Sequence, residues 1–474
     1  MAGTILSRGR LAMLLAVLLA GLAWPAAAAE GLDGVGLSRA WGLPFAGVLL
    51  SIALMPILAP SLWHHHYGKI AAFWSLAFLL PFALVHGIGA AGDEVAHVAL
   101  QEYLPFLALL TALYTTGGGV LLRGTLTGTP LTNTGLLTIG TLLASVMGTT
   151  GASMLLIRPV LRANAQRGRK THTFVFFIFL VANIGGSLTP IGDPPLYLGF
   201  LQGVAFFWPT IHLFQPFLFC AGVLLGLYWV LDSLLYAREP AREPATTPRE
   251  KLRIEGGSNL FLIGVVVFGV LMQGVWRPGE VVLLGQHIGL ERLTAIALFA
   301  LVTVVSIRMT PSALRDENGF AWGAMAEVAK LFAAIFLCMA PVLAILKAGP
   351  SGEAAGLVAL TSGPSGEPVP WVFFWMTGAL SSFLDNAPTY LVFFNLAGGD
   401  AAQLMGPEAA TLAAISAGAV FMGANSYIGN APNFMVKAIV EESGFRMPTF
   451  FGYCAWAMMI LIPLFVLCTF LFFR

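Results

Sequence analysis

Apolar runs long enough to cross a lipid bilayer recur through most of this chain of 474 residues. A helix needs about 20 apolar residues to span the hydrocarbon core of a membrane. Hydrophobic residues make up 58% of the sequence and charged residues 10%, whereas a soluble domain carries about 25% charged residues. We therefore predict an all-α polytopic membrane protein that has the lipid bilayer as its main partner. The net charge of +1 gives no indication of a nucleic-acid partner.

Residues 1–29 have the pattern of a secretory signal peptide. Arg8 and Arg10 precede an apolar run, and an alanine-rich stretch ends at Ala29, where we predict cleavage. An uncleaved first helix is the alternative. We count ten spans and two hairpins after this segment, so the mature N- and C-termini are both expected outside. The predicted location is a bacterial-type cell inner membrane.

The charged residues predict which loops face the cytoplasm. The segment 158–170 contains five basic residues and no acidic residue, and the positive-inside rule places such a segment inside the cell. Residues 237–257 are predicted to form a cytoplasmic linker. This linker separates an N-terminal half, 42–236, from a C-terminal half, 258–474.

Three adjacent histidines lie between the first two predicted spans, 42–63 and 69–89. These are His64, His65 and His66. Adjacent residues of a helix do not share a face, so we expect an interfacial loop here and not a metal site.

Two of the apolar stretches are interrupted by residues that cannot continue an α-helix. Residues 185–195 contain three prolines and three glycines, which break the predicted span 173–204. Residues 423–433 interrupt the predicted span 409–443 in a similar way. Backbone of this kind is tolerated at membrane depth only where it is buried in protein or lines a cavity. We therefore predict two broken transmembrane helices.

Two other stretches are predicted to be re-entrant hairpins, which enter and leave the membrane on one side. In the hairpin 136–165, short apolar arms flank a polar tip at 148–153. In the hairpin 371–397, the polar tip is 385–389. Basic flanking residues place the first hairpin on the cytoplasmic side, and mainly acidic flanking residues place the second on the outer side.

The two halves of the chain match each other at a nearly constant offset. Residues 189–197 resemble residues 426–434, and 426 − 189 = 237. The same offset aligns the tip 148–153 with residues 385–390. Because the predicted topology gives the two halves opposite orientations, we predict two inverted-topology repeats. In many secondary transporters of this layout, the broken helices meet at mid-membrane and form the transport site.

Two acidic residues stand at these irregular segments, Asp193 and Asp385. A carboxylate inside a membrane is costly, so it indicates function by default, although Asp193 can also cap a half-helix. Such a group can hold either Na⁺ or a proton, and neutral oxygen atoms can complete a Na⁺ site. The predicted ion-binding or substrate-binding residues are Thr149, Thr150, Ser153, Ser187, Thr189, Asp193, Asp385, Asn386, Thr389, Asn425, Ser426 and Asn430. We predict no cofactor, no metal site beyond Na⁺ at these residues, and no enzymatic activity.

The segments 183–195, 385–388 and 423–433 resemble the ion transporter superfamily. This superfamily includes D-type sodium/proton antiporters, citrate-metal transporters, divalent-anion/sodium symporters and arsenite permeases. The resemblance covers residues 42–473 and implies two re-entrant hairpins, two broken helices and a homodimer. The divalent-anion symporters carry Ser-Asn-Thr at the hairpin tips, whereas the tips here read Thr-Thr-Gly at 149–151 and Asp-Asn-Ala at 385–387.

We predict a secondary active transporter of a small ion, of the sodium/proton antiporter type. The reason is that no lysine or arginine lies within either tip or either break. A citrate, dicarboxylate or arsenite carrier of the same superfamily is the alternative, because the amides at helix ends can bind anions. An intramembrane aspartyl protease is a further alternative, but Pro190 stands where its Gly-x-Gly-Asp signature requires the first glycine.

Overall fold

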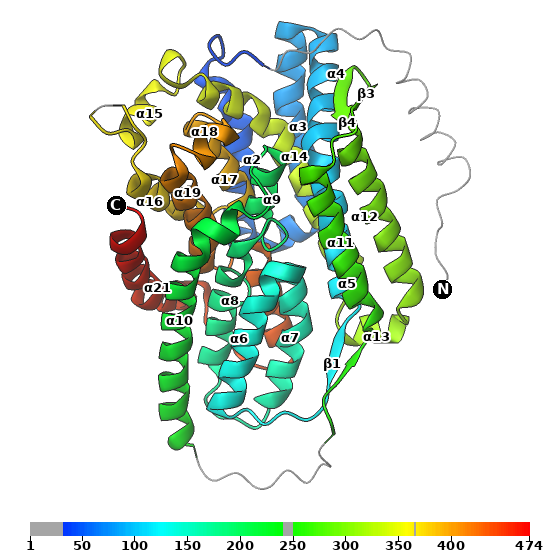
Figure 1. The fold of residues 1–474 in the computed structure, drawn as a ribbon, viewed down its shortest axis with the longest axis vertical. Helices are drawn as coiled ribbons and strands as arrows, with labels where there is room; N and C mark the ends of the chain where they lie inside the picture. Colours follow the sequence, from blue (N-terminus) through cyan, green and yellow to red (C-terminus); the bar gives the residue numbers. More distant parts are fainter. Residues whose placement is uncertain (1–31, 240–249, 365) are drawn as a thin grey trace.

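The computed structural model describes residues 32–239, 250–364 and 366–474. The predicted signal peptide, 1–29, and the centre of the predicted linker lie outside these residues. The described chain is mostly helical (Figure 1). Within it, ten helical stretches are long and apolar enough to cross a membrane, which confirms a multi-pass membrane protein. They cover 39–58, 60–86, 88–117, 130–147, 171–188, 208–237, 258–275, 290–309, 322–347 and 450–472.

The N-terminal half consists of helices with one short strand, β1 (Leu121–Arg123). Its α-helices are α2 (Leu43–Leu58), α3 (Pro60–His86), α4 (Ile88–His97), α5 (Leu104–Gly117), α6 (Pro130–Met147), α7 (Thr149–Ala163), α8 (Thr171–Leu180), α9 (Pro194–Leu201) and α10 (Trp208–Ala237). Shorter turns are the 3-10 helices η1 (Arg39–Gly42) and η3 (Ile184–Leu188) and the π-helix η2 (Val98–Tyr103).

The C-terminal half has a similar composition, with strands β2 (Arg253–Glu255), β3 (Glu280–Leu283) and β4 (Gln286–Gly289). Its α-helices are α11 (Ser258–Val275), α12 (Leu290–Met309), α13 (Ser312–Glu317), α14 (Trp322–Lys347), α15 (Ala355–Thr361), α16 (Pro370–Ser381), α17 (Asn386–Leu396), α18 (Ala401–Met405), α19 (Ala409–Met422), α20 (Ala431–Glu442) and α21 (Phe450–Phe472). Two 3-10 turns are η4 (Gly349–Ser351) and η5 (Gly423–Asn425).

The predicted loop around His64, His65 and His66 is wrong, because all three histidines lie inside α3. Helix α2 ends at Leu58, and Pro60 starts α3 almost immediately. Proline is favoured at the first helical position, where its missing N–H leaves no hydrogen bond unmade. The second span is therefore longer than predicted.

Helix α6 packs against α7, and α16 contacts α17. Gly148 joins α6 to α7 with a φ of 81°, a conformation that glycine adopts without steric cost. Helix α6 begins six residues before the predicted hairpin arm (136 − 130 = 6), which makes it long enough to count as a span. In Figure 1, α6 and α7 lie in the lower half of the molecule, whereas α16 and α17 lie in the upper half.

Two helical paths are interrupted where the prolines and glycines predicted it. Helix α8 ends at Leu180, and after η3 the chain enters α9 with Pro194 and Pro195 in its first turn. Helix α19 ends at Met422, and the chain enters α20 only at Ala431. Asp193 and Asn430 immediately precede the second helices, and both have an extended backbone.

The strands form two small antiparallel pairs, β1 with β2 and β3 with β4. Arg123 of β1 donates to Glu255 of β2 at 2.7 Å. This hydrogen bond lowers the pKa of the Glu255 carboxyl. The pair therefore ties the segment before α6 to the segment before α11.

Candidate functional site

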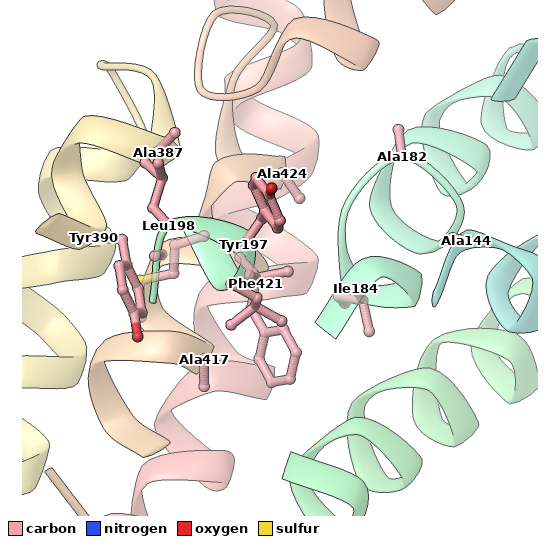
Figure 2. Close-up of a cluster of buried hydrophobic side chains, with 14 of the residues drawn as sticks. Ala144, Ala182, Ile184, Tyr197, Leu198, Ala387, Tyr390, Ala417, Phe421 and Ala424 are labelled. Atoms are coloured by element: carbon pink, nitrogen blue, oxygen red, sulfur yellow. The ribbon is translucent and has the colours of Figure 1, made fainter. Parts of the chain in front are cut away.

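The two interruptions meet in one buried cluster. Figure 2 shows side chains of α6, α9, α17 and α19 together with side chains of both interrupted segments. Ala182 and Ala424, one beside each interruption, are fully buried. Small side chains allow the backbones of these segments to approach closely. Regions that lie more than 200 residues apart in the sequence are therefore packed together.

A single carboxylate connects four of these segments. Asp193, which precedes α9, is 1% exposed. Its Oδ1 accepts hydrogen bonds from Thr149 Oγ1 at 3.0 Å and from Asn430 Nδ2 at 3.1 Å. Its Oδ2 accepts a hydrogen bond from Asn386 Nδ2 at 2.5 Å. The start of α7, the start of α17 and the residue before α20 thus all contact the residue before α9.

The two acidic residues use their carboxylates differently. Asp193 stands at the N-cap position of α9 but accepts no capping hydrogen bond from that helix. Asp385 caps α17, because its Oδ1 accepts from Ala387 N at 3.0 Å. The three side-chain donors around Asp193 are neutral, and none of its hydrogen-bond partners among the described residues carries a charge.

Both acids line a cavity of about 140 Å³. Thr149, Thr150 and Asn430 also line it, and no lysine, arginine or histidine stands among the described residues around it. Beside it, Asn386 Oδ1 is buried and has no hydrogen-bond partner in the described chain. An unpaired buried oxygen next to a carboxylate suits a cation, since hard cations prefer oxygen ligands.

None of the remaining predicted site residues donates a hydrogen bond to Asp193 in the described chain. Most of them donate to backbone carbonyl groups instead. Ser187 Oγ donates to Ile184 O and Thr389 Oγ1 to Asp385 O, so both hydroxyls serve their own turns. Ser153 Oγ is buried without a partner in the described chain. The others contact Ser145 or Ser382, which are 237 positions apart and so correspond to each other in the two halves. Thr189 donates to Ser145 O, Ser426 donates to Ser382 O, and Asn425 donates to Ser382 Oγ.

Two asparagines of the cluster were not among the predicted site residues. Asn183 Nδ2 donates to Asn433 Oδ1 at 2.7 Å, and Asn183 Oδ1 accepts from Asn430 Nδ2 at 3.3 Å. Asn433 Nδ2 donates to Gly423 O and Ser426 O, both at 2.8 Å. A carboxamide inside an apolar run is the signal that could have found Asn183. The pairing itself joins residues 250 positions apart, so it depends on the fold.

Comparison with known families assigns the chain. The family CitMHS_2, described as "Putative citrate transport", matches residues 34–473. No match was found among curated proteins. This is a family of transporters and not of enzymes, and its description favours the citrate alternative over the sodium/proton antiporter type. The chain belongs to this citrate transport family, a branch of the ion transporter superfamily.

Proposed function

We propose that this secondary transporter carries a polycarboxylate of the citrate class and couples its movement to cations held at Asp193. The family membership supplies the substrate class. The cation site is supported by one observation: Thr149, Asn386 and Asn430 all donate hydrogen bonds to the buried Asp193 carboxylate.

The proposed cation ligands are oxygen atoms of Asp193, Asn386 and Thr149. Carbonyl groups freed where α8 and α19 end are further candidates, because the last turn of a helix leaves its carbonyls without intrahelical partners. A buried ionised carboxylate is costly unless a cation or strong hydrogen bonds compensate it. Binding of Na⁺ or a proton to Asp193 removes that cost, and this links the occupancy of the site to the ion gradient.

The charge of the cavity explains why a polycarboxylate would need accompanying cations. Asp193 and Asp385 both line it, and no basic residue does so among those described. A bare polyanion would be repelled there, since like charges at short range in a medium of low dielectric cost several kcal/mol. Bound cations neutralise the acids first, so ion binding precedes or accompanies the substrate.

We also propose the inverted architecture, with re-entrant hairpins formed by α6–α7 and α16–α17. Hydrogen bonds repeated at an offset of 237 support it. Ser145 Oγ donates to Gly185 O, and Ser382 Oγ donates to Met422 O; 382 − 145 = 237 and 422 − 185 = 237. The opposite placement of the two helix pairs in Figure 1 also supports it. The homodimer, the inner-membrane location and the outer termini stay predictions.

Sodium/proton exchange without an organic substrate is the second candidate function. The two carboxylates and the neutral oxygens around the cavity favour it. A carboxylate that alternately holds Na⁺ and a proton is sufficient for such exchange. The two candidates share the Asp193 site and differ only in whether citrate moves.

Reconstitution of the purified protein into proteoliposomes distinguishes cation-coupled citrate transport from sodium/proton exchange. We expect uptake of radiolabelled citrate when an inward Na⁺ or proton gradient is imposed, and loss of that uptake in Asp193→Asn. Glu353→Gln, which removes an exposed partner of Arg39, should transport like the wild type. A Na⁺-driven change of internal pH with no citrate uptake would favour the second candidate. Gradient-independent citrate uptake in Asp193→Asn would contradict both.

A further inference from the structure

A second cavity, of about 490 Å³, lies beside the end of α9 that is farther from Asp193. The segment 202–207 after α9 forms one wall, and the last turns of α11 with the start of α12 form the other. This is the end of the molecule that carries the β3–β4 hairpin (Figure 1). Among the described residues, it shares no lining residue with the cavity around Asp193, so it is a separate site.

The charged residues of this second cavity favour an anionic ligand. Arg277 and Arg292 line it, against one acidic residue among those described, Glu291. Arg292 is oriented by neutral carbonyl groups, because its Nη1 donates to Gln101 O at 2.9 Å and its Nη2 donates to Leu201 O at 3.3 Å. A guanidinium has five N–H donors, so donors of Arg292 remain for a ligand.

Arg277 has its charged group free at the mouth of the cavity. It follows the last turn of α11 and is exposed. Its side chain makes no hydrogen bond or ion pair within the part of the chain that the structure describes. The neighbouring Trp276 is 45% exposed, and tryptophan is enriched where the membrane meets water, at the level of the lipid headgroups. Arg277 therefore stands where a lipid phosphate can reach it.

Exposed apolar side chains lead away from the cavity along two membrane-spanning helices. On α11 they recur every seven residues, and on α10 every three or four, so each set lies on one helix face. They are Val275, Phe268 and Phe261 on α11, and Phe207, Ile211, Phe214 and Leu218 at the start of α10. Phe207 and Val275 also line the cavity itself. Lipid acyl chains can pack on these faces while the headgroup reaches the arginines.

We propose that this cavity binds the headgroup of an anionic phospholipid, with its phosphate held by Arg277 and Arg292. Arginine pairs with phosphate oxygens in a bidentate geometry, and basic pockets between transmembrane helices bind anionic headgroups. A soluble anion would use the arginines alone, whereas a phospholipid also uses the exposed apolar faces of α10 and α11. The inference does not depend on which solute the protein transports.

Native mass spectrometry of the purified full-length protein tests this site by titration with phosphatidylglycerol or phosphatidylcholine of identical acyl chains. We expect the wild type to bind phosphatidylglycerol about fivefold more tightly, since each basic residue near an anionic headgroup contributes about 1 kcal/mol. Arg277→Gln should remove most of this preference and leave phosphatidylcholine binding unchanged. Glu291→Gln should strengthen phosphatidylglycerol binding, because it removes the opposing charge.

Arg308→Gln, an exposed change at the other end of α12, is the matched control and should keep the preference. Equal affinity of the wild type for the two lipids overturns the proposal, as does an unchanged preference in Arg277→Gln. Thermal unfolding in phosphatidylcholine nanodiscs checks that Arg277→Gln is folded, which we expect because the replaced side chain is exposed.

Two soluble anions, glycerol 3-phosphate and citrate, distinguish a lipid from a free ligand at this site. Each is added to the wild type already loaded with phosphatidylglycerol. We expect the lipid to stay bound, because the soluble anions lack acyl chains to pack on α10 and α11. Displacement of the lipid by either anion at an equal concentration would overturn the assignment to a phospholipid.

Discussion

The neutral donors around Asp193 leave its charge uncompensated. Thr149, Asn386 and Asn430 supply hydrogen bonds but no positive charge. A structural ion pair would place an arginine or lysine here, as the chain does elsewhere for Asp232. A carboxylate surrounded by amide and hydroxyl groups is instead suited to a mobile counter-ion, which can leave when the transporter changes state.

Asn386 should contribute to ion affinity beyond its structural role. Asn386→Ala removes the donor at 2.5 Å from Asp193 Oδ2 and the unpaired Oδ1. We expect Na⁺ to bind about tenfold more weakly, because the ion loses the Oδ1 oxygen as a ligand, and a polar contact to a charged group contributes about 1.5–3 kcal/mol. The measurement is Na⁺-dependent thermal stabilisation of the purified protein.

Asn395→Ala is the matched control for that change. Asn395 is buried on the same helix, α17, and its Nδ2 donates to Leu391 O. It should lower the melting temperature without altering the Na⁺ dependence. Equal Na⁺ dependence in both variants would argue against a ligand role for Asn386.

At the scale of elements, the interrupted helices depend on glycines that let backbones touch. A Cβ added at Gly192 would lie 2.2 Å from Gly186 O, and one at Gly429 would lie 2.5 Å from Ser381 O. Real Cβ atoms do not approach backbone oxygens so closely. The segments that carry Asp193 and Asn430 therefore have no room for a side chain at these positions.

We expect Gly192→Ala and Gly429→Ala to abolish gradient-driven transport and to lower the melting temperature by several degrees, since overpacking costs about 1–3 kcal/mol. Gly222→Ala in α10 is the control, because nothing lies within 4 Å of its added Cβ. Assays of uptake and of thermal unfolding on the same preparations decide the matter. Full activity in Gly192→Ala would mean that the backbone contact is not needed.

A buried cluster of charged and titratable side chains lies beside the end of α7, in the α6–α7 pair. Arg167, just after α7, lies 2.5 Å from Asp232 of α10, and His172 of α8 lies 2.8 Å from the same Oδ1. Both members of the Arg167–Asp232 pair are fully buried. The cluster connects three elements, so its loss should loosen the α6–α7 pair.

Arg167→Met should destabilise the protein by about 3–5 kcal/mol, because it leaves a buried carboxylate without its cation. Adding Asp232→Asn to that variant removes the second charge and should restore much of the lost stability. Thermal unfolding of the single and double variants in one detergent gives the comparison. A double variant less stable than Arg167→Met would contradict this account.

The elements that depend on nearby residues could be predicted from the sequence. Clusters of prolines and glycines within about ten residues cannot continue a helix, although single prolines such as Pro56 and Pro341 lie inside helices. The interruptions before α9 and α20 and the polar tip at Gly148 could therefore be predicted. The His64–His66 loop was wrong, because a proline can start a new helix as readily as end one. The Asn183–Asn433 and Arg167–Asp232 pairs could not be found, because each partner is distant in sequence and only the tertiary fold brings it near.

At the scale of the whole molecule, the proposed inversion predicts opposite exposure of the two helix pairs. Gly168→Cys, in the turn after α7, should react only from the cytoplasmic side. Ala402→Cys, in α18 after the second pair, should react only from outside. Both positions are exposed. Labelling of intact cells with a membrane-impermeant maleimide, in a variant without its four native cysteines, measures this. Labelling of both from one side would refute the inverted repeats.

The Asp193 carboxylate, which joins α7, α9, α17 and α20, should bind the coupling ion. Binding of radiolabelled sodium to the purified protein tests it most directly, with the wild type, Asp193→Asn and the exposed Asp400→Asn compared under one set of conditions. We expect saturable binding that disappears in Asp193→Asn and persists in Asp400→Asn. Undiminished sodium binding by a folded Asp193→Asn protein would contradict it.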